Sequence, residues 1–182
     1  LGLLLSAFSR GGTELERDDL TAAAEGLAGF IRQELVLSSG LLRAGTGLPA
    51  EGTARDYLLV SDGLLTHAGI VGDTKIREQG LALAGTALRR FADPDNGRFL
   101  TSDESESPGI WGRVPLPVPD TSDLPGADAA FLMLDHKHRL SEALGVGIEA
   151  FTASMVDDME MSAEPPTGDK LLALRLILQK NE

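Results

Sequence analysis

The chain has 182 residues, of which 16 are Lys or Arg and 28 are Asp or Glu, so its formal net charge is −12. Nucleic-acid phosphates and anionic membrane surfaces attract clustered cations, so this acidic balance argues against both as partners. There is no cysteine, which excludes disulfides and thiolate metal sites, and the longest apolar runs fall well short of the roughly 20 residues that cross a bilayer.

Two helices are expected in the first forty residues. The run Leu3–Phe8 has the pattern of the tail of a helix, whose start we expect to lie outside the sequence, and Gly11-Gly12 is expected to end it. Acidic residues favour helix starts, so Asp18-Asp19 marks the next helix, which we expect to end at Ser38–Gly40. Its apolar residues recur at spacings of three and four: Leu20, Ala23, Ala24, Leu27, Phe30, Ile31 and Leu35.

A short apolar run, Gly40–Ala44, is expected to be extended, and a second pair of helices follows it. The first spans Ala54–Ile70 and breaks at Gly72, and the second spans Lys75–Phe91 after the capping residues Asp73-Thr74. The core face of the second helix is expected to hold Ile76, Leu81, Ala84, Leu88 and Phe91.

The rest of the chain begins with a turn and continues irregularly. Asp93–Gly97 has turn composition, and Arg98–Leu100 is expected to be a second short extended piece. Residues 102–125 contain five prolines and are expected to form a long irregular loop. Further helices are expected near 128–140, 145–161 and 170–179.

An internal repeat relates the two pairs of helices. Gly40-Leu41-Leu42 and Gly97-Arg98-Phe99 lie 57 residues apart, and at the same offset Leu27 aligns with Ala84 and Ile31 with Leu88. Chance similarity between two amphipathic helices is one explanation. A helical-hairpin repeat is the better one, and such hairpins close into a ring or stack into a solenoid.

Five stretches, in this order, carry a resemblance to a known family: Gly2–Phe8, Gly40–Arg43, Arg55–Tyr57, Phe91–Leu100 and Asp120–Ala130. They resemble the C-terminal helical region of thioredoxin-domain-containing proteins related to the spermatogenesis-associated thioredoxin-like protein. That region is similar to the α/α toroids of six-hairpin glycosidases and N-acylglucosamine 2-epimerases. The resemblance implies an all-α fold, with residues 1–182 forming a single partial toroid of about three helical hairpins joined by short extended segments.

The same resemblance indicates candidate catalytic residues on a helix that would line the ring. Asp56 and Tyr57 could act as acid and base or bind a polyol, or they could instead serve the helix start and the core. His67 is a candidate general base, because related epimerases use histidines, or a hydrogen-bonded core residue. The sequence departs from the family pattern at Arg55, which replaces an acidic residue, and at Ala127, which replaces an asparagine.

The substrate-binding candidates lie further along the chain. Trp111, in the long loop near three acidic residues, would lie near the mouth of the cavity, or these loop residues could simply be solvated. Asp120 and Asp128 are the other two candidates, and Asp128 would lie at the start of an inner helix. Asp128 replaces a serine of the family pattern. His136 and His138 are two residues apart, which points them to different sides of a helix, so we expect no metal site.

Two functions are compatible with these features. The first is a non-catalytic structural or interaction subunit, a degenerate partial toroid that docks on another protein chain covering its open edge. The alternative is an epimerase-like or glycosidase-like domain that acts on a small carbohydrate in a central cavity. No cofactor is expected in either case, and the compartment cannot be inferred.

Overall fold

The computed structural model describes residues 1–47, 50–93 and 98–99. Residues 1–87 and 88–182 form two compact units. Four helices pack together in the described part: α1 (Gly2–Glu14), α2 (Asp18–Phe30), α3 (Ala54–Val71) and α4 (Thr74–Phe91). The all-α prediction is thereby confirmed for these residues, whereas the ring of a toroid stays a prediction. The loop expected at 102–125 and the helices expected after it lie outside the described residues.

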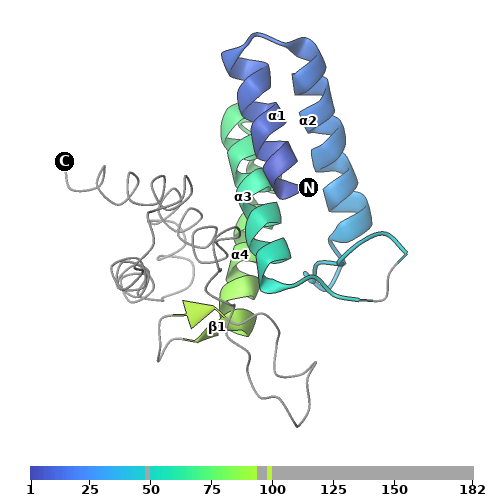
Figure 1. Cartoon of the computed structure of the whole chain (residues 1–182), viewed down its shortest axis with the longest axis vertical. Coiled ribbons are helices and arrows are strands. Elements are labelled where there is room, and N and C mark those ends of the chain that lie inside the picture. Colours follow the sequence, from blue (N-terminus) through green and yellow to red (C-terminus); the bar gives the residue numbers. More distant parts are fainter. Residues whose placement is uncertain (48–49, 94–97, 100–182) are drawn as a thin grey trace, which may run out of the picture. The chain divides into compact units, whose positions relative to one another are not determined.

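α1 and α2 form an antiparallel hairpin, drawn in blue in Figure 1. The prediction that Gly11-Gly12 ends the first helix is wrong, because α1 continues to Glu14. Glycine inside a helix costs about 1 kcal/mol relative to alanine. At Gly12 the missing side chain admits α2, since a Cβ there would lie 2.5 Å from Oγ1 of Thr21. The glycine pair therefore brings two helices together.

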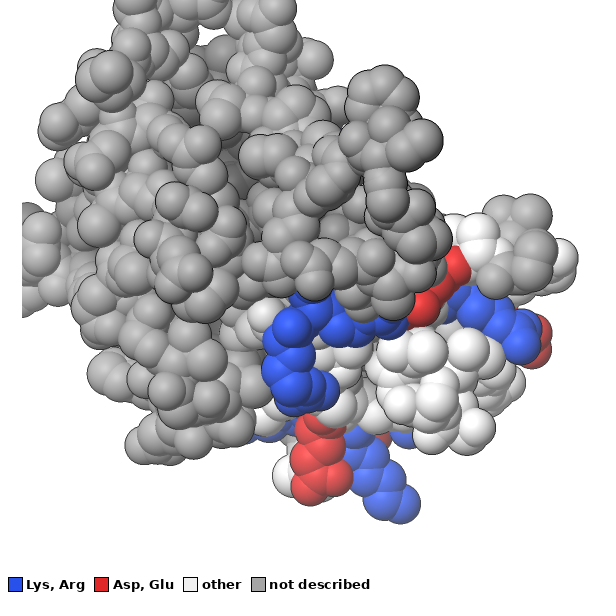
Figure 2. Space-filling view, turned by 90° about the horizontal axis from the view of Figure 1, so that it is seen from below, with Lys and Arg blue, Asp and Glu red and all other residues white. Residues whose placement is uncertain are grey.

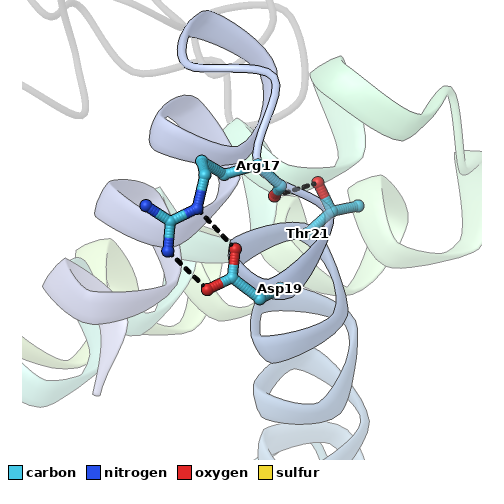
Figure 3. A network of polar contacts seen from close by, with 3 residues as sticks. All are labelled: Arg17, Asp19 and Thr21. Atoms are coloured by element: carbon cyan, nitrogen blue, oxygen red, sulfur yellow. Dashed lines mark hydrogen bonds and ion pairs between the residues drawn. The ribbon is translucent and has the colours of Figure 1, made fainter.

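α2 begins at Asp18, as predicted, beside an exposed polar network (Figure 3). Arg17 donates from Nε and Nη2 to the two carboxylate oxygens of Asp19, at 2.8 and 2.7 Å, and Thr21 Oγ1 donates to the Arg17 carbonyl at 3.3 Å. The hydrogen bond from Arg17 lowers the pKa of Asp19. Because both side chains of the ion pair are exposed, it contributes little to the stability of the fold.

The junction between α3 and α4 follows the predicted break and cap. Gly72 adopts a left-handed conformation with φ of 73°, which glycine accepts without strain. The Asp73 carboxylate then accepts the backbone N–H groups of Lys75 at 2.8 Å and Ile76 at 3.1 Å. These bonds, above all the one from Ile76, lower the pKa of Asp73. On α4, Leu83 is buried, whereas the expected core residue Leu81 is only half-buried.

Each helical pair is followed by a short extended segment, as the repeat predicts. After α2, a single π-helical turn, η1 (Ile31–Leu35), leads to an antiparallel bridge between Val36 and Leu42. After α4, β1 (Ala92–Asp93) pairs antiparallel with β2 (Arg98–Phe99). The order helix, turn, helix and extended piece is thus confirmed for both helical pairs.

α3 is the helix against which the others are arranged. Gly63 packs on α1 so closely that a Cβ there would lie 2.6 Å from the Gly2 carbonyl oxygen. On the side of α4, Ser61 Oγ donates to the Gly80 carbonyl at 2.6 Å. Most of α3 is consequently buried, and the largest fully buried side chains of the described part come from several elements: Tyr57, Leu5, Ile31, Leu42, Leu58, Leu64 and Leu83.

The contact between Gly63 and Gly2 gives a direct test of this packing. Gly63→Ala should lower the free energy of unfolding by about 1–3 kcal/mol, because the new methyl group meets backbone that cannot rotate away. Gly26→Ala is the matched control, since a Cβ at Gly26 in α2 meets nothing within 4 Å. The control should raise stability by about 0.5–1 kcal/mol. Urea denaturation measures both, and equal effects of the two substitutions would contradict the packing.

Candidate functional site

Asp56 takes part in a capping box at the start of α3. Its backbone N–H donates to Thr53 Oγ1 at 3.4 Å, and its Oδ2 accepts the backbone N–H and the hydroxyl of Thr53, each at 2.8 Å. This reciprocal arrangement satisfies donors that a helix start otherwise leaves unpaired. The spacing of Thr53 and Asp56 is itself a capping-box signal in the sequence, and it supports the structural alternative for Asp56.

Tyr57 lies fully buried and fastens the segment before α3 to the helix. Its hydroxyl donates to Glu51 Oε1 at 2.5 Å and accepts the backbone N–H of Leu42 at 2.8 Å. Leu42 lies in the first extended segment, where it forms the bridge with Val36, and Glu51 pairs with Arg43 across a second bridge. The Tyr57 hydroxyl thus bonds to two positions, Leu42 and Glu51, in the segment between η1 and α3. This structural role requires neither a substrate nor a cavity.

His67 is buried between α3 and α1. Its Nδ1 lies 2.9 Å from Oγ of Ser9, and the two residues are 3% and 4% exposed. Burial lowers the pKa of His67, while the negative charges of Glu25 and Asp73 act in the opposite direction and more weakly. The lowered pKa favours the neutral imidazole, in keeping with a hydrogen-bonded core histidine.

The three catalytic candidates occupy different places along α3. Ten residues separate Tyr57 from His67, which corresponds to about 15 Å along the axis of an α-helix. Asp56 bonds to the residue that caps the helix, Tyr57 to the preceding segment and His67 to α1. This arrangement favours a structural role for each residue over a shared catalytic site that acts on one substrate.

Sequence reasoning did not find the partners of these residues. Ser9 is 58 positions away from His67, and Ser6 on the next turn of α1 donates to Asp62 Oδ2 at 3.0 Å, across 56 positions. No local pattern signals pairs so far apart. Glu51 is only six positions from Tyr57, but it precedes the helix and carries no periodic signal.

The substrate-binding candidates Trp111, Asp120 and Asp128 lie outside the described residues, as do His136 and His138. Within residues 1–47, 50–93 and 98–99, no three His, Asp or Glu side chains are grouped in a way that could hold a metal ion.

Charged side chains of both signs lie on the surface of the described part. Figure 2 shows both basic and acidic side chains on one face of this part. Among its helices, none is both long and apolar enough to cross a membrane.

Comparisons with known proteins found no relative of this chain. No family model, curated protein or solved structure matches the chain. The resemblance to the thioredoxin-domain-containing family therefore stays a prediction from the sequence, and functional inference depends on the geometry of the described residues.

The hydrogen bonds of Tyr57 predict the effect of removing one oxygen atom. Tyr57→Phe should lower the free energy of unfolding by about 1–3 kcal/mol, because it deprives the backbone N–H of Leu42 of its acceptor. Glu51→Gln is the control, since it preserves an acceptor for the phenol, and it should cost less. Chemical denaturation measures both, and a Tyr57→Phe variant as stable as the parent chain would contradict the anchoring role.

Proposed function

We propose that the chain is a non-catalytic interaction subunit, a degenerate partial α/α toroid that docks on another protein chain through the outer face of α1. The partner we expect is a protein with an apolar surface. The net charge of −12 argues against nucleic acid in this role.

The observation that carries this proposal is the orientation of α1. Three of its four buried residues, Gly2, Ser9 and Gly12, are small. Bulky apolar residues point the other way, since Leu3 is 58% and Leu4 49% exposed. A helix of a globular protein ordinarily turns its apolar stripe to the core and its polar face to water.

Exposure of the outer face of α1 to water is therefore unfavourable in free energy. Complete burial of a leucine side chain contributes about 1.5–3 kcal/mol, so covering Leu3 and Leu4 would favour association. Isolated exposed leucines are common on protein surfaces, but this stretch has no charged side chain before Arg10. Neighbouring exposed leucines of this kind are typical of a surface that contacts another protein.

The enzymatic alternative has less support from the described residues. It requires Asp56, Tyr57 and His67 to share one cavity, and each of them instead has a hydrogen-bonding role in the fold. A carbohydrate site would also need groups that contact the sugar, and the candidates for that task lie outside the described residues.

Native mass tests the proposal. The isolated chain should self-associate as its concentration rises, because the outer face of α1 is uncovered, and its mass should exceed 19.2 kDa in sedimentation velocity. Leu3→Gln combined with Leu4→Gln should return the mass toward that of the monomer.

A double variant on α2, Ala22→Gln with Ala23→Gln, is the matched control, because both alanines are exposed on a different helix. It should associate like the parent chain. A parent chain that stays a well-dispersed monomer at all concentrations, or a control that dissociates as fully as the leucine variant, would contradict docking through α1.

A further inference from the structure

The contact between α1 and α3 combines close backbone packing with polar pairs. We call it the α1–α3 seam, formed by Gly2, Ser6 and Ser9 of α1 with Gly63, Asp62 and His67 of α3. Leu5 is the one bulky apolar residue among the buried residues of α1. The attachment of α1 therefore depends on hydrogen bonds to a greater degree than an ordinary apolar helix contact does.

One of these hydrogen bonds involves a group that titrates near neutral pH. Neutral His67 can share a proton with Ser9 in either direction across the 2.9 Å between Nδ1 and Oγ. A protonated imidazole has two N–H donors and a full charge, which a site only 3% exposed solvates poorly.

The charged groups around His67 reduce this penalty without removing it. Glu25 of α2 and Asp73, which precedes α4, both favour the protonated ring, while α1 contributes the neutral hydroxyl of Ser9. Burial outweighs them and lowers the pKa of His67. Because the pKa is lower in the folded chain than in the detached state, the seam is most stable above about pH 6.5 and weakens as the pH falls below it.

The hydrogen bond between Ser61 of α3 and Gly80 of α4 lacks this sensitivity to pH. Ser61 Oγ donates to the backbone carbonyl of Gly80 at 2.6 Å, and neither group titrates near neutral pH. Acid should therefore act on the attachment of α1 before it acts on the attachment of α4.

We propose that the α1–α3 seam is an acid-sensitive latch, in which protonation of His67 loosens α1 from α3 while α4 stays packed on α3. The latch is independent of the docking function proposed above. It would nevertheless control any partner held by α1, since the outward leucines and the seam lie on the same helix.

Hydrogen exchange of the full chain, followed peptide by peptide and corrected for the intrinsic effect of pH on exchange, tests the latch. Between about pH 7 and pH 5, protection of the α1 amides should fall by a larger factor than that of the α4 amides. His67→Asn should abolish this difference, because asparagine can place an amide near the Nδ1 position but does not titrate in this range. Equal loss of protection in α1 and α4, or an acid effect that persists in His67→Asn, would overturn the proposal.

The parent chain provides a second measurement that does not require the variant to fold. The imidazole resonances of His67 should titrate over the same pH range in which α1 loses protection. Ser9→Ala keeps the titrating ring but removes its partner, so α1 in that variant should already be less protected at pH 7 than in the parent chain. Titration of His67 without any change in α1 protection, or full α1 protection in Ser9→Ala, would equally overturn the latch.

Discussion

The close approach of α1 to α3 is the constraint on which the rest of the described structure depends. Gly2 and Gly63 let two backbones meet where any side chain would separate them. That approach brings Ser9 within hydrogen-bonding distance of His67. It also fixes the rotation of α1 about its axis, so that small residues face inward and leucines such as Leu3 face water. The exposed leucines of α1 and the polar seam are two consequences of one packing arrangement.

The three catalytic candidates each have a hydrogen-bonding role in the fold, and catalysis by them stays a prediction. Asp56, Tyr57 and His67 have the functional groups of acid–base catalysis, and the sequence could identify them as polar residues on an apolar helix. It could not tell catalysis from structure, because that distinction depends on partners such as Ser9, far away in the chain. For Asp56 the sequence itself indicates a structural role, because Thr53 lies at capping-box spacing from it.

The fold was predictable where local chemistry decides it. Asp73 caps α4 and Gly72 ends α3 in the predicted places, because each acts on its own neighbours in the chain. The prediction at Gly11 and Gly12 is wrong because these glycines serve the packing of α1 on α2, where Gly11 faces Leu20 and Gly12 faces Thr21. A glycine pair that breaks a helix and one that admits a neighbouring helix look alike in a sequence. Periodicity also cannot show whether repeated hairpins close into a ring.

An engineered disulfide is the most direct measurement of the α1–α3 packing, because the chain contains no cysteine of its own. Ser6 hydrogen bonds to Asp62 across the seam, where the α1 and α3 backbones approach closely, so cysteines at these two positions should form a disulfide faster under mild oxidation than a pair outside the seam. Ala23→Cys with Asp62→Cys, whose first position is exposed on α2, is the control and should stay reduced. Rapid disulfide formation in the Ser6 and Asp62 pair alone is the predicted result. Two pairs that oxidise equally, or a seam pair that stays reduced, would contradict the packing of α1 on α3.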